Sequence, residues 1–138
     1  MKKILITQYF RKVLKKFKNH FNEQDIVSNI KEFMRIGFRK GEAKLTTELF
    51  DNITVEIVKL RIHVHNSVGR YLIGIIDKSE YLPIFIDLKT GHYGKNMSFN
   101  SDKKITSMLE SAIENTLFDY LEHTKENQRL VEYIIEEQ

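Results

Sequence analysis

The sequence contains no cysteine, one proline and no long apolar run. Without cysteine there is no disulfide, and thiolate metal sites and cysteine nucleophiles are excluded. No apolar segment approaches the roughly 18 residues needed to cross a bilayer, and the first residues lack the long apolar stretch and cleavage site of a signal peptide. We therefore expect a cytoplasmic protein held together by a hydrophobic core, with no membrane partner.

Charge is unevenly distributed along the 138 residues, which by length predict a single domain. Residues 1–101 carry 18 basic and 10 acidic side chains, a balance of +8, whereas residues 102–138 carry 4 basic and 9 acidic ones, a balance of −5. This asymmetry favours a polyanionic partner for the basic part, and nucleic acid is the first candidate.

The first half of the chain predicts a strand over residues 3–7 and two helices. Apolar residues recur every three or four positions from Phe10 to Phe21, which predicts the first helix, and again over residues 23–35, which predicts the second. The second helix should end near Gly37, which suits a C-cap. The first helix carries lysines on its other face, and residues 1–20 hold seven bases and no acid, more than a merely solvated helix needs. Residues 37–52 predict an irregular, mobile connection.

Three strands are expected over residues 53–65, 70–77 and 82–89, joined by turns. Apolar residues alternate with polar ones, so one face of the sheet is apolar. The single proline, Pro83, fits the first residue of a strand or an edge strand. The opposite face gathers Lys59, Arg61, His63, His65, Arg70, Asp87 and Lys89. Any half-buried sheet alternates, but the excess of bases indicates anion binding.

Two features of this basic face leave alternatives open. His63 and His65 share a face and suggest a metal, yet no third ligand stands at a meaningful spacing, so we expect no metal. His92 and Tyr93 stand between two glycines directly after the third strand, either as a polar turn or as the working edge of a site.

The last quarter predicts helices. A stripe from Ile105 to Leu121 has helical spacing, with Ser101 or Asp102 as its cap, and a weaker helical pattern follows over residues 130–135. We expect the acidic helix around residues 110–122 to pack on the helices of the same domain and to limit how much of the sheet a partner covers.

The order strand, helix, helix and three strands, with "KILITQYFRKVLKKF" and "KLRI…GRYLIGII", resembles bacterial toxins of the RelE/ParE superfamily over roughly residues 1–95. The resemblance implies an α+β fold, a RelE-like small antiparallel sheet with an N-terminal strand and a helical hairpin packed on one face. Residues 1–100 would form this domain, and residues 101–138 a helical extension packed on it.

The resemblance also implies an activity, that of an mRNA interferase. Such toxins cut messenger RNA on the ribosome without metal or cofactor, by attack of a ribose 2′-hydroxyl on the adjoining phosphate. Arg61 and Arg70 would hold the phosphate, Lys89 matches a basic position, and His92 or Tyr93 would transfer protons or stack a base. The RNA-binding residues would be Lys59, His63, His65, Lys95, Lys12, Lys15 and Lys16.

A toxin also implies a partner, a cognate antitoxin that wraps the basic body. Two alternatives stand beside the nuclease: a gyrase-directed toxin of the ParE branch, or a nucleic-acid-binding module that contacts phosphates without catalysis. An inert protein of the same fold is a third reading.

Overall fold

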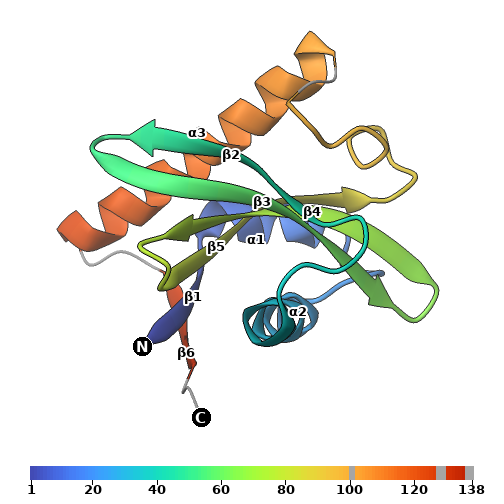
Figure 1. Cartoon of the computed structure of the whole chain (residues 1–138), viewed down its shortest axis with the longest axis horizontal. Helices are drawn as coiled ribbons and strands as arrows, with labels where there is room; N and C mark the ends of the chain where they lie inside the picture. Colours follow the sequence, from blue (N-terminus) through green and yellow to red (C-terminus); the bar gives the residue numbers. More distant parts are fainter. Residues whose placement is uncertain (100–101, 127–129, 136–138) are drawn as a thin grey trace.

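In the computed structural model, the described residues form a six-stranded sheet and three helices (Figure 1). The structure describes residues 1–99, 102–126 and 130–135, with side chains over 1–99, 102–122 and 130–135. The elements are β1 (Lys2–Ile6), α1 (Gln8–Lys15), α2 (Glu23–Ile36), β2 (Ala43–Phe50), β3 (Ile53–Val64), β4 (Ser67–Ile76), β5 (Glu80–Leu88), α3 (Lys103–Glu126) and β6 (Val131–Ile135).

The sheet is mixed, in the order β2-β3-β4-β5-β1-β6. Strands β2 to β5 form an antiparallel meander, whereas β1 pairs parallel to β5 and antiparallel to β6. The α+β class is confirmed, but the expected purely antiparallel sheet is wrong. Parallel pairing of β1 with β5 is possible because a long connection through two helices and three strands separates them.

Two strands replace segments for which the sequence predicted other structure. Strand β2 lies inside the expected irregular connection, and β6 replaces the expected last helix. In β6, half-buried Val131, Tyr133 and Ile135 alternate with exposed Glu132 and Ile134, a period of two that suits pairing with β1. The last described segment of the extension is therefore a strand of the main sheet.

The helices begin at side-chain caps. Thr7 accepts a hydrogen bond from Phe10 N at the start of α1, and Asn22 and Asp25 form a capping box on α2. Asp102 accepts a hydrogen bond from Ile105 N and is the cap of α3, whereas Ser101 lies outside the described residues. Helix α1 ends earlier than predicted, and the chain continues as turns that still bury Phe21.

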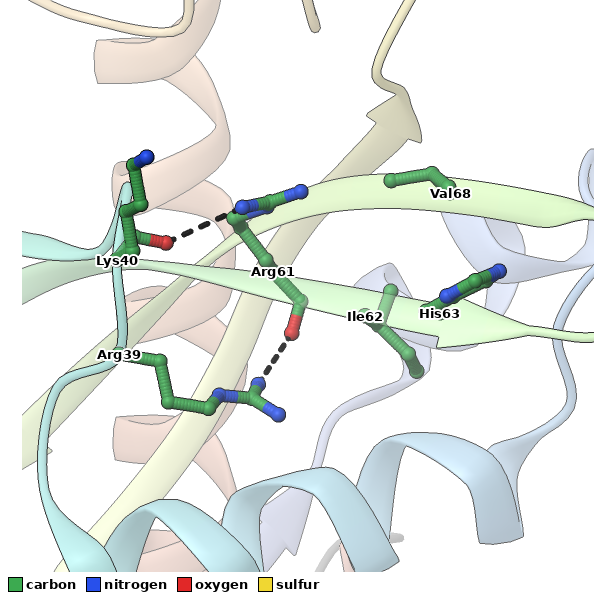
Figure 2. A pocket seen from close by; sticks show the side chains of 6 residues that line it. All are labelled: Arg39, Lys40, Arg61, Ile62, His63 and Val68. Atoms are coloured by element: carbon green, nitrogen blue, oxygen red, sulfur yellow. Dashed lines mark hydrogen bonds between the residues drawn. The ribbon is translucent and has the colours of Figure 1, made fainter.

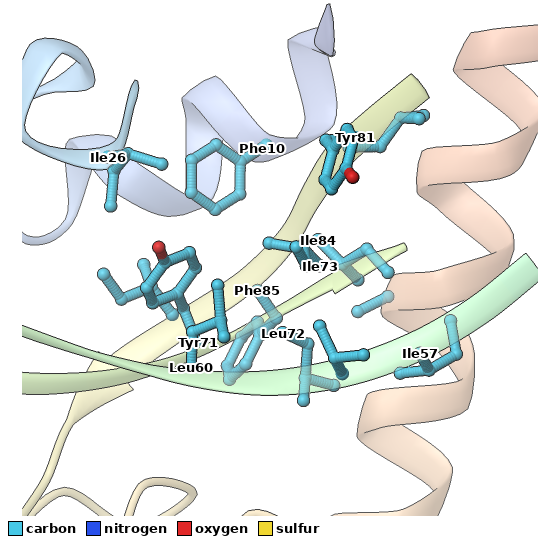
Figure 3. Close-up of a cluster of buried hydrophobic side chains, with 14 of the residues drawn as sticks. Phe10, Ile26, Ile57, Leu60, Tyr71, Leu72, Ile73, Tyr81, Ile84 and Phe85 are labelled. Atoms are coloured by element: carbon cyan, nitrogen blue, oxygen red, sulfur yellow. The ribbon is translucent and has the colours of Figure 1, made fainter. Parts of the chain in front are cut away.

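Helices α1 and α2 cover one face of the sheet (Figure 3). The Tyr71 hydroxyl of β4 donates to Asn29 Oδ1 of α2, and a Cβ on Gly69 would lie 2.8 Å from the Phe21 ring. Helix α3 lies on the opposite face, where its Ile113 and Leu117 line a pocket together with Phe50 of β2. It also reaches α1, because Tyr9 N donates to Asp119 Oδ2. Helix α3 covers only one end of that face, and this decides where polar side chains are accessible.

Pro83 lies inside the central strand β5, not at the predicted strand start or edge. The register between β4 and β5 shifts at this point, from Leu72 opposite Phe85 to Ile73 opposite Pro83. A bulge leaves one residue out of the ladder, so the missing N–H of proline is tolerated there.

None of the helices in the described ranges is both long enough and apolar enough to pass through a bilayer.

Candidate functional site

Arg61 of β3 lies directly opposite Arg70 of β4, which lies opposite Asp87 of β5. The predicted shared face of these three residues is confirmed. The backbone N–H and C=O of Arg61 are bonded away from β4, so Arg61 and Arg70 are a non-hydrogen-bonded pair with Cα atoms about 4.5 Å apart. In the part of the chain that the structure describes, neither guanidinium has an ion pair with a carboxylate.

The backbone of Arg61 lies beyond the start of β2 and is satisfied by two side chains of the preceding loop. Glu42 Oε2 accepts from Arg61 N at 2.8 Å, and Arg39 Nη2 donates to Arg61 O at 2.7 Å. Arg39 and Glu42 also form an ion pair of 2.9 Å, in which the Glu42 side chain is fully buried. Together they take the place of a pairing strand and tie this loop to β3.

Opposing effects act on the Glu42 carboxyl. Burial by itself would raise the pKa of Glu42, but hydrogen bonds from the Arg39 side chain and from the N–H groups of Arg61 and Arg39 outweigh it. The pKa of Glu42 therefore lies below its ordinary value. The carboxylate is charged at neutral pH, and it accepts its hydrogen bonds from groups of this network.

A pocket of about 200 Å³ opens beside this network (Figure 2). It is lined by Arg39, Lys40, Arg61, Ile62, His63 and Val68. The Arg61 guanidinium donates one bond to Lys40 O at 3.2 Å, which leaves most of its donors for a ligand. Arg39 is held by Glu42, so Arg61 and Lys40 are the cations that this pocket offers to a ligand. With the exposed His63 beside them they suit a phosphate with an adjacent proton-transfer step.

Lys59 adds positive charge to the same face. It is half-buried, burial lowers its pKa below the ordinary value, and the positive charge of Arg70 lowers it further. Repulsion between two neighbouring cations is relieved when an anion binds. Lys59 and Arg70 are therefore neighbouring cations on this end of the sheet.

Asp87 organises the loop that follows β5. Its carboxylate accepts hydrogen bonds from the N–H groups of Leu88, Tyr93 and Gly94, at 2.8, 2.9 and 3.1 Å. A Cβ on Gly94 would lie 1.8 Å from Leu88 O, and one on Gly91 would lie 2.3 Å from Asp87 Oδ1. Close backbone approach explains both glycines, and Asp87 has a structural role.

Arg70 also holds this loop through hydrogen bonds. Its Nη1 donates to Gly94 O at 2.8 Å and to Lys95 O at 3.3 Å, while its buried Nε has no partner. Tyr93 packs edge-on against Phe85, with ring centroids 5.6 Å apart, and His92 packs against Tyr93 at 4.8 Å. Arg70 therefore ties the exposed His92 to the basic face, at the cost of part of its own hydrogen-bonding capacity.

The remaining predicted site residues are dispersed. Lys89 and Lys95 are exposed on the loop after β5. His65 lies in the turn after β3 with φ 52°, so the strand alternation that predicted its shared face with His63 does not extend to it. The lysines of the first helix point to solvent on the other side of the sheet and do not join the pocket: Lys12, Lys15 and Lys16.

Sequence reasoning missed Arg39, Lys40 and Glu42. The signal was present in "FRKGE", where two bases and one acid stand around Gly41, but such a stretch is also typical of a solvated loop. In the described part of the chain, no three or more His, Asp or Glu side chains are grouped so that they could hold a metal ion.

Comparisons with protein-family models, with characterised proteins and with solved structures each find no match to this chain.

Proposed function

We propose that this protein is a metal-independent endoribonuclease, the toxin of a toxin–antitoxin pair that acts on messenger RNA in the cytoplasm. One observation carries the proposal: Arg61 and Arg70 lie opposite each other with no ion pair to a carboxylate among the described residues, and Arg61 lines a pocket with Lys40 and His63. Two arginines on neighbouring strands suit the two non-bridging oxygens of a phosphodiester.

The chemistry needs a proton acceptor, charge stabilisation and a proton donor. In the proposed step the ribose 2′-oxygen attacks the adjoining phosphorus while its proton passes to His63, which lines the pocket beside Arg61. The bond from phosphorus to the 5′-oxygen breaks, and His92 gives that oxygen a proton. The products are a 2′,3′-cyclic phosphate and a free 5′-hydroxyl, and Arg61 with Lys40 stabilises the charge on the phosphorane.

The second proton-transfer group, His92, lies on the loop after β5. The bonds from Arg70 and Asp87 hold the backbone around His92 and Tyr93, and Tyr93 supports the His92 ring. Tyr93 is thus a positioning residue for His92, and Lys89 and Lys95 supply positive charge near the same loop.

The test is cleavage of RNA by purified protein, alone and with programmed ribosomes, together with mapping of transcript ends after inducible expression in bacteria. The proposal expects growth arrest, new ends that carry a cyclic or 3′-phosphate, and loss of these ends in His63→Gln and His92→Ala with the fold intact by circular dichroism. Normal growth with intact transcripts, and intact RNA in both purified reactions, contradicts it.

A second candidate is a nucleic-acid-binding module that contacts phosphates without cutting. The observation that favours it is the use of Arg70 Nη1 by loop carbonyls, which reduces the donors available for catalysis. Such a module binds RNA with a steep salt dependence and yields no product. If the protein is a toxin, we propose that an antitoxin covers the pocket. Growth arrest with DNA-damage signalling and intact transcripts would indicate gyrase as the target.

A further inference from the structure

Phe38 is half exposed, at 50%, directly before the two cations of the pocket loop, Arg39 and Lys40. Helix α2 ends at Gly37, whose φ of 78° turns the chain out of the helix. Exposure of a phenyl ring has a hydrophobic cost. The two residues that follow it in the chain, Arg39 and Lys40, line the pocket.

The ring has one aromatic neighbour, and the residue that follows it in the chain is fixed by polar contacts. Phe33 of α2 packs against it with ring centroids 5.2 Å apart and an interplanar angle of 46°. On the other side along the chain, Arg39 is fixed by the ion pair with Glu42 and the bond to Arg61 O. Phe38 therefore stands in a defined place, with an exposed part of its surface available to a ligand.

We propose that Phe38 is a nucleobase-stacking subsite, which receives a base of the RNA whose phosphate lies at Arg61. The inference rests on the proposed function. Aromatic side chains beside a cationic groove are how proteins bind single-stranded nucleic acid, because every base has a face to stack and every nucleotide a phosphate to neutralise. Ile36, two residues earlier in the chain, is also half exposed and would equally suit a protein partner, but Arg39 and Lys40, which follow Phe38, favour the nucleic acid.

The sequence contains no tryptophan, so Phe38→Trp creates a single fluorescent reporter at the subsite. The probe is a single-stranded 2′-O-methyl oligonucleotide, which binds but lacks the nucleophile for cleavage, compared with an abasic oligonucleotide of the same phosphate number. We expect strong quenching by the first and little by the second. We also expect Phe38→Ala to bind the first roughly tenfold more weakly, as loss of one stacked base predicts.

Phe118 provides the matched control, because it is a phenylalanine of similar exposure, 60%, on the acidic helix α3. Phe118→Trp should not be quenched, and Phe118→Ala should bind like the parent. The subsite is overturned if the parent protein binds the oligonucleotide but Phe38→Trp shows no quenching and Phe38→Ala binds normally. That result would leave the proposed function standing. Loss of self-association or of antitoxin binding in Phe38→Ala, with RNA binding unchanged, overturns it too and assigns the ring to a protein interface. Parent protein that binds no RNA overturns both.

Discussion

One face of β3 has two ends of opposite character. Val55 and Ile57 are fully buried at the end where α3 covers the sheet, whereas Lys59, Arg61 and His63 follow on the same face at the end that α3 does not reach. The covered end obeys the usual rule that a sheet face is closed by an apolar layer. The uncovered end has charged side chains where an apolar layer would otherwise pack. This exception to the rule locates the candidate site.

The largest expected effect lies at the covered end. Ile57→Ala should lower the free energy of unfolding by about 3 kcal/mol, because it removes a buried side chain and leaves a cavity between β3 and α3. Chemical denaturation measures this. Oligonucleotide affinity, measured where the variant is folded, should stay within about twofold, and a large loss of affinity would show that the two ends are not independent.

At the uncovered end the largest effect should be on rate. His63→Gln should slow RNA cleavage by roughly 100-fold, since it removes the proposed proton acceptor, while affinity for the 2′-O-methyl oligonucleotide changes little. Single-turnover kinetics separate the two quantities. His65→Gln is the control, because His65 lies outside the pocket in the turn after β3; equal slowing in both variants would remove His63 from the mechanism.

Glu42→Gln should lower stability by about 2 kcal/mol at pH 7, because it removes the charge that satisfies Arg39 and the Arg61 N–H. The folded pKa of Glu42 is depressed, so its contribution is fully present above its unfolded pKa of roughly 4.3 and is lost as pH falls through the folded pKa. Denaturation from pH 7 to pH 3 should therefore show a shallower loss in the variant. A parallel profile would mean that Glu42 contributes no proton linkage.

The smallest of these effects should be on affinity. Arg61→Ala should weaken oligonucleotide binding roughly fivefold and reduce the salt slope by about one, as loss of one phosphate contact predicts. Arg35→Ala is the control, an exposed arginine of α2 outside the pocket. Equal effects of both variants would indicate diffuse attraction by net charge instead of a site.

The part of the site that lies within one strand pattern was predictable. Alternation in β3, β4 and β5 placed Arg61, Arg70 and Asp87 on one face, and the register agrees. The loop at residues 39–42 was not predictable, because its order comes from side-chain bonds to a backbone 19 residues away, which no local pattern contains.

Other misses share that cause. Strands β2 and β6 are edge strands whose pairing depends on partners elsewhere in the chain, and Pro83 is tolerated in β5 only because of a bulge opposite Leu72 and Ile73. The role of Asp87 as a loop organiser depends on contacts with Tyr93 and Gly94 that strand alternation could not show.

RNA should bind at the uncovered end of β3 and not at the lysines of α1. The most direct measurement is a titration of isotope-labelled protein with the 2′-O-methyl oligonucleotide, followed by NMR through backbone amides and arginine Nε–H groups. We expect the largest shifts at Lys40, Arg61 and His63, with Lys12 and Lys15 nearly unmoved. Shifts centred on Lys12 and Lys15, or no saturable shift in the pocket, would contradict it.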